Sequence, residues 1–302
     1  MLPVLASDPK PLLDLFLEGR SPQTLRAYRS DIEAFAAFVG ATPTDACGRL
    51  IAGSAGDANA LVLAFRIEQQ RRELRPSTIN RRLAAVRSVV KLARMIGLVA
   101  WAVEVPSLPV QPYRDTRGPG RRGVRLLLDD ISRRDTAKAK RDYSIVRLLY
   151  DLGLRRGEVA SLDLEHLLIE DAALLVQRKG GTQRVRMTLP AKTILALQTW
   201  LAVRGTVPGP LFNSFDRARK GNRMTAEAIY GFLRWYGDLL HIRIRPHGLR
   251  HAAITEALEM TNGDVRAVAK FSGHRRIETV LFYDDARRDI GGDVARLVAE
   301  GV

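Results

Sequence analysis

Apolar residues recur every three to four positions through most of the first hundred residues, and this spacing predicts amphipathic helices. One helix is predicted from Pro22, behind the N-cap residue Ser21, to a stop at Gly40. Two more are predicted, one starting at Asp57 and one over 75–97. The buried face of the first helix is expected to consist of Leu25, Tyr28, Ile32 and Phe35.

The pattern changes after residue 140. The stretch RDYSIVRLLYDLGLRRGEVASLDLEHL predicts a helix, a glycine turn and a second helix that begins near Arg155. The following stretch AALLVQRKGGTQRVRMTLP holds two short apolar runs joined across KGG, which is typical of a β-hairpin. Residues 191–302 contain further helical patterns separated by polar turns. The chain is therefore predicted to be mainly α with a small β-sheet, in the α+β class.

A segment rich in proline, glycine and arginine, VPSLPVQPYRDTRGPGRRG at 105–123, interrupts these patterns. Such a composition without hydrophobic periodicity is typical of an extended linker, here a basic one. At 302 residues the chain is long enough for two domains. We therefore expect a helical domain over 1–104, a linker over 105–123 and a second domain over 124–302.

Charge narrows the range of partners. The chain has 48 Lys and Arg against 33 Asp and Glu, a net charge of +15, which favours polyanions: nucleic acid first and an anionic membrane surface second. No apolar run approaches the ~18 residues of a membrane span, and the start of the chain lacks the basic segment of a secretory signal. Cys47 is the only cysteine, which excludes an internal disulfide framework and a multi-cysteine metal site. A cytoplasmic protein with no membrane partner is expected.

Basic residues are dense between Arg71 and Arg94, where eight Lys and Arg accompany one acidic residue, Glu73. An apolar stripe that includes Leu83 and Val86 runs through the same segment. Two interpretations stay open: a solvated basic face, or a helix that faces DNA phosphates. Under the second, the predicted DNA contacts are Arg71, Arg72, Arg75, Arg81, Arg82, Arg87 and Lys91, with Arg121 and Arg122 of the linker.

The stretch RPHGLRHAAITEAL, at 245–258, crowds histidines and arginines into the start of a predicted helix. His247 and Arg250 are three residues apart and therefore share a helix face. Free backbone N–H groups at a helix start and the forked donors of arginine both suit an oxyanion such as phosphate. His251, four residues after His247, would also fit a metal pair, but Gly248 stands where the metalloprotease pattern needs glutamate, so no metal is expected.

Two other fragments could carry chemistry. In GLRRGEV, Arg155 lies three residues before Glu158, which is also the spacing of an exposed ion pair on a helix. His274 follows a Ser-Gly turn, and Tyr283 comes nine residues later, where core packing and a nucleophilic role are both open. Each fragment alone has an ordinary structural explanation, but together they share a suitability for phosphate.

In this order the motifs resemble those of the tyrosine recombinases of the phage-integrase and Xer type. The resemblance covers about 126–283, where it implies a mixed α/β catalytic domain, and more loosely the N-terminal helices, where it implies a SAM-like core-binding domain. Glu158 falls on a supporting acidic position. Arg156 and Arg178 depart from the usual family pattern, Arg178 standing where glycine is usual, and whether they alter the roles of their neighbours stays open. The catalytic residues that the resemblance implies are Arg155, Lys179, His247, Arg250, His274 and the nucleophile Tyr283.

The resemblance implies an enzyme that cuts and rejoins duplex DNA through a 3′-phosphotyrosyl intermediate and a Holliday junction. Two arginines would stabilise the charge on the phosphate, so neither a metal nor another cofactor is expected. A homo-tetramer would act on paired recombination sites. The target sequence, the histidine that accepts the proton and the need for an accessory protein stay open. The alternatives are a type IB-like topoisomerase and a DNA-binding regulator whose active site has decayed.

The tail after the tyrosine carries a second apolar pattern. Gly291 and Gly292 predict a hinge, and a small apolar stripe follows them. We expect this stripe to dock on a neighbouring protomer, and folding onto its own domain is the alternative. The stripe consists of Val294, Leu297 and Val298.

Overall fold

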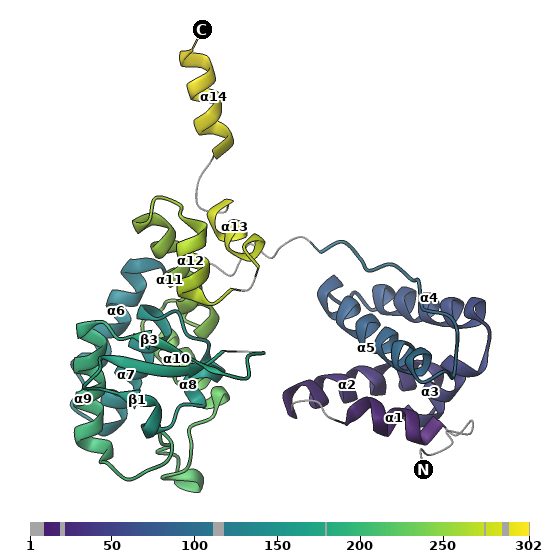
Figure 1. Cartoon of the computed structure of the whole chain (residues 1–302), viewed down its shortest axis with the longest axis horizontal. Coiled ribbons are helices and arrows are strands. Elements are labelled where there is room, and N and C mark those ends of the chain that lie inside the picture. The colour runs from purple at the N-terminus through teal and green to yellow at the C-terminus, as the bar shows by residue number, and fades with distance from the viewer. Residues whose placement is uncertain are drawn as a thin grey trace. The chain divides into compact units, whose positions relative to one another are not determined.

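The computed structural model describes residues 9–18, 22–110, 118–178, 180–274, 276–285 and 290–301. The chain divides into two compact units, Met1–Tyr113 and Arg114–Val302 (Figure 1). The division falls inside the segment that composition predicts as a linker, 105–123.

The first unit is built from helices, as far as its residues are described. They are α1 (Pro9–Leu17), α2 (Pro22–Val39), α3 (Pro43–Ala52), α4 (Ala55–Arg71) and α5 (Pro76–Met95). Side-chain caps fix two of the starts: the hydroxyl of Thr42 accepts a bond from the backbone N–H of Asp45 (3.2 Å), and Ser54 forms a capping box with Asp57. Gly40 closes α2 in the left-handed region, with φ of 66°.

Two of the three helices predicted in this unit are confirmed, since α2 starts at Pro22 and α5 fills most of 75–97. The predicted start at Asp57 is two residues late. Asp57 is the third residue of α4, where its carboxylate accepts the backbone N–H of Ser54 (2.9 Å). The sequence prediction omits α1 and α3, and the predicted N-cap Ser21 lies outside the described residues.

Helix α5 supplies much of the core of the first unit. Leu83, Val86 and Val90 on its predicted apolar stripe are buried. Phe35 of α2 and Phe65 of α4 meet edge to face beside them, with 5.2 Å between the ring centroids. Burial of this stripe leaves the basic side chains of α5 on its remaining faces.

The chain after α5 packs back onto the first unit. Val105 is buried with residues of α4 and α5. Leu108 makes two 2.8 Å hydrogen bonds with the amide of Asn80, donating its N–H to Oδ1 and accepting from Nδ2. Arg87 donates to the carbonyl of Val105. The first residues of the predicted linker therefore belong to the first unit, because their apolar side chains are accommodated on it.

The second unit is mainly helical with one small sheet, as predicted. Its sheet has three antiparallel strands in the order β1-β2-β3, with Leu175 of β2 opposite Arg186 of β3. The predicted hairpin is therefore confirmed. The elements are α6 (Gly120–Ser132), α7 (Ala137–Asp151), α8 (Arg156–Ala160), η2 (Leu164–His166), β1 (Leu167–Leu168), β2 (Ala173–Gln177), β3 (Arg184–Thr188), α9 (Ala191–Arg204), η3 (Arg217–Arg219), α10 (Ala226–Leu239), α11 (Pro246–Met260), α12 (Val265–Ser272), α13 (Glu278–Asp285) and α14 (Ile290–Glu300).

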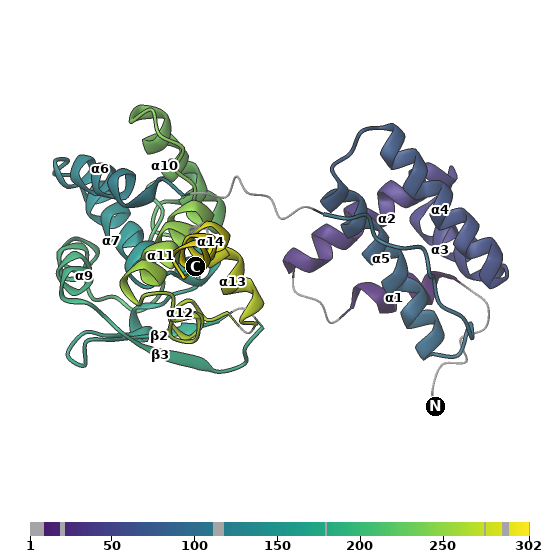
Figure 2. The same cartoon turned by 90° about the horizontal axis from the view of Figure 1, so that it is seen from above.

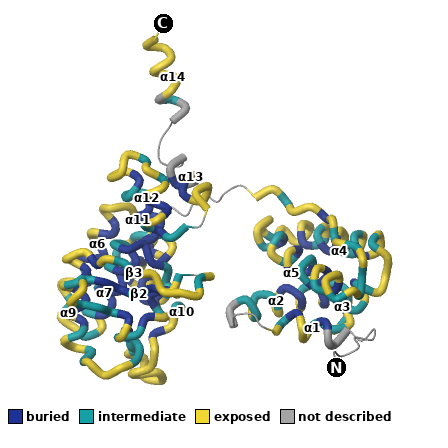
Figure 3. The backbone as a smooth tube through the Cα atoms, in the orientation of Figure 1, coloured by how far each residue is buried: buried dark blue, intermediate teal, exposed yellow. Residues whose placement is uncertain are grey.

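Helices α7 and α11 organise the second unit. Helix α11 contacts α6, α7, α10, α12 and α13, and Figure 2 shows it in the middle of these helices. Buried backbone is concentrated around α7 and β2 (Figure 3), where Leu148 and Leu149 are fully buried. Gly153 follows α7 with φ of 57°, a left-handed turn that favours glycine and leads the chain into α8. The functional motifs are held by this turn and by helices α8 and α11 to α13.

The tail forms helix α14, and its predicted apolar stripe is exposed, with Leu297 68% accessible. The prediction of a hinge at Gly291 and Gly292 is wrong, because both glycines lie in the first turn of α14. Within the described ranges no helix has both the length and the apolar character to cross a membrane.

Candidate active site

Arg155 and Glu158 form the first part of the site, at the start of α8. One carboxylate oxygen of Glu158 accepts a hydrogen bond from the backbone N–H of Arg155, and the other accepts one from Nη1 of the Arg155 side chain, both at 2.9 Å. Glu158 is buried, whereas Arg155 is partly exposed. The neighbouring Arg156 points elsewhere: it pairs with Glu227 of α10 (3.3 Å) and lies over the ring of Tyr230. Arg155 rather than Arg156 therefore joins the cluster around Glu158.

Arg250 connects three segments that are distant in sequence. It is only 2% exposed; its Nη1 donates to the carbonyl of Gly153, and its Nη2 donates to the carbonyl of Ser272 (2.7 Å). The same Nη2 lies 3.1 Å from Nε2 of His274. Burial, and then the positive charge of Arg155, lower the pKa of Arg250 to about 10, so the guanidinium stays charged at neutral pH.

The bonds around His274 define its tautomer. Because an arginine nitrogen can only donate, Nε2 of His274 accepts from Arg250, and the ring proton therefore sits on Nδ1. That Nδ1 is 2.8 Å from the hydroxyl of Ser272, which donates onward to the carbonyl of Val268 (2.7 Å). Burial, followed by the charges of nearby arginines led by Arg250, lowers the pKa of His274 to about 4. His274 is thus a neutral, oriented base at neutral pH.

We expect nuclear magnetic resonance of the ring nitrogens to show His274 neutral and protonated on Nδ1 down to about pH 4, below its ordinary pKa of 6.5. The unfolded chain binds this proton more readily, so His274 favours the folded state above pH 6.5, and that contribution is lost as the pH falls toward 4. Titration of His274 near pH 6.5 would contradict the deduced network.

His247 stands at the start of α11, directly after Pro246. Its side chain is exposed overall, yet the surrounding protein removes part of its hydration and lowers its pKa, and the charges of Arg250 and Arg155 lower it further. A second neutral imidazole is therefore available beside the arginines.

Tyr283 lies in α13 and is 7% exposed. Its ring packs with Ile254 and Val268, at 6.0 Å between ring centroids from His274 and at 4.6 Å from His251. Burial raises the pKa of the hydroxyl, whereas the positive charges of Arg250 and Arg155 act in the opposite direction. The structure thus brings both predicted arginines within electrostatic reach of the predicted nucleophile.

Two residues of the cluster are missed by the sequence prediction. His251, considered there only as a metal ligand, packs against the tyrosine ring. Arg178 lies at the base of the hairpin and contacts Glu158, with Nη1 3.4 Å from Oε2. The signal for Arg178 was its unusual place before Lys179, and Lys179 itself lies outside the described residues.

The predicted DNA contacts fall into three groups. Three of the arginines bond within the first unit: Arg81 pairs with Asp31 (2.7 Å), and Arg82 donates to Gln69 (3.2 Å). Arg87 is the third, bonded to the chain after α5. Arg72 and Arg121 are exposed but pair with acidic neighbours. The remaining exposed members are Arg71, Arg75, Lys91 and Arg122.

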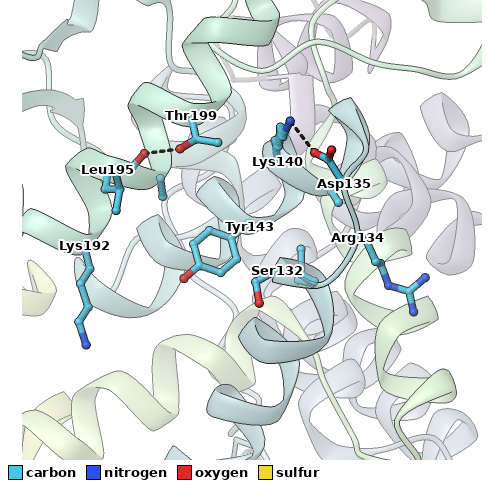
Figure 4. A pocket seen from close by; sticks show the side chains of 11 residues that line it. Ser132, Arg134, Asp135, Lys140, Tyr143, Lys192, Leu195 and Thr199 are labelled. Atoms are coloured by element: carbon cyan, nitrogen blue, oxygen red, sulfur yellow. Dashed lines mark hydrogen bonds and ion pairs between the residues drawn. The ribbon is translucent and has the colours of Figure 1, made fainter.

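Two pockets of the second unit lie away from this cluster. One of about 400 Å³ opens between α6, α7 and α9, and Figure 4 shows the ring of Tyr143 inside it. Lys140 on its wall pairs with Asp135 (2.7 Å). A neighbouring pocket of about 410 Å³ shares Tyr143 and Lys192. None of the predicted catalytic residues lines either pocket, so these two pockets are separate from the cluster of predicted catalytic residues.

Comparison with solved structures supports the fold. The chain is similar to the XerH site-specific recombinase bound to a palindromic difH substrate, with a TM-score of 0.70 and 15% identity over 96% of this chain and 84% of that chain. It is also similar to a lambda integrase dimer bound to a COC′ core site, with a TM-score of 0.64 and 14% identity over 93% and 95%. At these identities the likeness is one of fold.

Comparison of sequences supplies the family. Residues 123–289 match the phage integrase family, and residues 12–95 match the phage integrase N-terminal SAM-like domain. The chain is 36% identical to the tyrosine recombinase slr0733 of Synechocystis sp. over 96% of this chain and 94% of the relative. It is 30% identical to the tyrosine recombinase XerC of Pelobacter propionicus over 89% and 86%. The chain belongs to the phage integrase family of tyrosine recombinases.

Proposed function

We propose that this protein is a site-specific DNA recombinase that cuts and rejoins duplex DNA through a tyrosyl–DNA intermediate. The observation that carries the proposal is the meeting of Arg155, Arg250 and Tyr283, which come from three separate segments and interact electrostatically. The family and the net charge of +15 agree with a DNA substrate.

In the proposed cleavage step, the hydroxyl oxygen of Tyr283 attacks the scissile phosphorus. A bond from this oxygen to phosphorus forms, the bond from phosphorus to the 5′ oxygen breaks, and the DNA keeps a 3′-phosphotyrosyl linkage. The tyrosine proton passes to a neutral histidine, His247 or His274, and His274 accepts it at Nε2 only when Arg250 has turned from that nitrogen to the phosphate. Lys179 supplies a proton to the departing 5′ oxygen. Because the new linkage is a phosphodiester, the reverse attack by a 5′ hydroxyl reseals DNA without a nucleotide cofactor.

Positive charge at the site suits a phosphodiester transition state. Arg155 and Arg250 lie near the predicted nucleophile, and Glu158 holds Arg155 in place from a buried position. Preorganised donors of this kind stabilise charge that develops on non-bridging oxygens. The guanidinium groups would therefore take the electrostatic role that a divalent ion has in many phosphoryl transfers.

The side chains of the proposed active site differ in their exposure to solvent. Arg155 and His247 reach solvent, whereas Tyr283 and Arg250 are covered by protein. An incoming phosphate would therefore meet Arg155 and His247 first. Docking of the duplex has to displace part of the surface over Tyr283 before the attack.

The first unit would supply DNA binding, as its match to the SAM-like domain suggests. Arg71, Arg75 and Lys91 are exposed there and can contact backbone phosphates. Solved structures with this fold include a lambda integrase dimer bound to a COC′ core site. For this chain we propose recombination sites in duplex DNA as the substrate and a homo-tetramer as the assembly.

Helix α14 is the proposed link between protomers. Val294, Leu297 and Val298 follow one face and are exposed, so a neighbouring copy could bury them. We expect deletion of the residues after Gly291 to abolish tetramers on site DNA in mass photometry while single-copy DNA binding persists. Arg296→Ala, on the same helix, is the control. Tetramers of the truncated chain would show instead that the stripe serves its own domain.

The assay that tests the function is covalent trapping. Nicked duplexes from DNA flanking the gene are incubated with the protein in EDTA and resolved on denaturing gels. We expect a DNA-linked protein band with one preferred cleavage position. Relaxation of any supercoiled plasmid without site preference would favour the type IB-like topoisomerase, and tight binding without a covalent band would favour a decayed regulator.

A further inference from the structure

Arg178 is placed unlike an ordinary hairpin residue. It follows β2 directly, where exposed side chains are common, yet its side chain is only 13% exposed. Its Nη2 donates to the carbonyl of Phe271 (3.1 Å), and its Nη1 donates to the carbonyl of Ser272 (3.4 Å). These carbonyls belong to the last residues of α12, whose intrahelical partners are missing at a helix end. Arg178 therefore caps α12 from a different part of the chain.

The turn after α12 is shaped around this guanidinium. Gly273 adopts φ of 66°, and a Cβ atom built on it would lie 3.0 Å from both Cζ and Nε of Arg178. The next residue is His274, whose backbone N–H closes the turn onto Ala269 (3.0 Å). The position of Arg178 is thus coupled to the turn that presents His274.

The same side chain reaches two other elements. Its Nη2 lies 3.3 Å from the sulfur of Met187 on β3, and its Nη1 lies 3.4 Å from Oε2 of Glu158. Because Glu158 also binds Arg155, one carboxylate joins the two arginines. A buried cation beside other cations is costly unless it is paired, and Glu158 supplies that pairing.

From these contacts we infer that Arg178 is a positioning residue that fixes the β2–β3 hairpin against the turn of His274 and the Arg155–Glu158 pair. This inference rests on the proposed function, because the residue that follows Arg178 is Lys179, the proposed proton donor to the 5′ oxygen. Arg178 would hold the start of the hairpin tip in register with the phosphate-binding cluster. It would act on leaving-group protonation without touching the DNA itself.

A sulfur leaving group tests this role. A nicked duplex with the mapped cleavage site is made with either oxygen or sulfur at the 5′ bridging position, and sulfur departs without a proton because a thiol is far more acidic than an alcohol. General acids contribute roughly 10²–10⁴-fold. If Arg178→Ala loses part of this contribution, it should cleave the oxygen substrate at least ~10-fold more slowly than the wild type does. It should cleave the sulfur substrate at nearly the wild-type rate.

Matched variants sharpen the result. Arg186→Ala removes an exposed arginine from β3 of the same hairpin and should leave both rates unchanged. Lys179→Ala should likewise slow cleavage of the oxygen substrate and spare cleavage of the sulfur substrate. The double variant should cleave the oxygen substrate no more slowly than Lys179→Ala alone, because both changes affect the same proton transfer. Equal slowing of Arg178→Ala on both substrates, or no slowing on oxygen, would overturn the inference.

A second measurement does not depend on cleavage. Hydrogen exchange of the full-length chain without DNA should be faster in Arg178→Ala at the hairpin, 173–188, and unchanged in the first unit. Unchanged exchange at the hairpin would overturn the positioning role even if the enzyme is active. If wild-type protein cleaves no DNA, the proposed function fails, and the exchange result alone still decides whether Arg178 fixes the hairpin.

Discussion

Tyr283→Phe abolishes the covalent protein–DNA complex and leaves DNA binding intact. Phenylalanine keeps the ring that packs against Ile254 and Val268 and removes only the proposed attacking oxygen. Without a nucleophile the first chemical step is lost, so we expect a fall of at least ~10³-fold, below detection on the gel.

Tyr143→Phe is the matched control for this prediction. Tyr143 is a partly buried tyrosine of the same unit that lines a pocket away from the cluster. Its variant should form the covalent complex at the wild-type rate. A covalent band in Tyr283→Phe would show that another residue attacks the phosphate.

Arg250→Ala should be the second most damaging change, because it affects both rate and stability. Loss of one preorganised donor to a developing oxyanion costs roughly 10²–10³-fold in rate. The substitution also removes this donor from the buried carbonyl of Gly153, at about 1–3 kcal/mol for an unsatisfied group, and leaves the carbonyl of Ser272 with only the longer bond from Arg178 (3.4 Å). Single-turnover cleavage and urea denaturation measure the two effects separately.

Arg250→Lys separates the effect of charge from that of side-chain geometry, and Arg245→Ala is its control. Arg250→Lys keeps a positive charge but cannot reach both carbonyls with a planar fork, so we expect it to lose most of the rate. Arg245→Ala removes an exposed arginine just before α11 and should change neither quantity. Full activity of Arg250→Ala, with a stable fold, would remove Arg250 from the proposed chemistry.

The sequence predicts helices and strands correctly where a single local signal is strong. Helices α2 and α5 have long apolar periodicity between clear start and stop residues, and the hairpin has two short apolar runs around glycines. The prediction omits helix α3, although Thr42 and Asp45 form a recognisable cap, because its 10 residues give a short pattern and two of its buried residues, Ala46 and Cys47, are small. Composition does not show that Val105 and Leu108, at the start of the predicted linker, pack on the first unit.

The order of the motifs predicted which side chains meet, but not how they are held. Arg250 is bonded by carbonyls of Gly153 and Ser272, and a sequence does not show which distant backbone groups a side chain will find. In the sequence, Arg178 is only a departure from the usual family motif. Its burial between α12 and Glu158 becomes visible in the fold alone. Long-range backbone contacts therefore limit what sequence motifs can tell about this site.

The most direct test of the central claim is to identify the amino acid that carries the DNA. The trapped complex is digested with nuclease and trypsin, and the modified peptide is sequenced by mass spectrometry. We expect a nucleotide 3′-phosphate on Tyr283, in the tryptic peptide IETVLFYDDAR at 277–287. A nucleotide on any other residue, or a linkage to a 5′-phosphate, would contradict it.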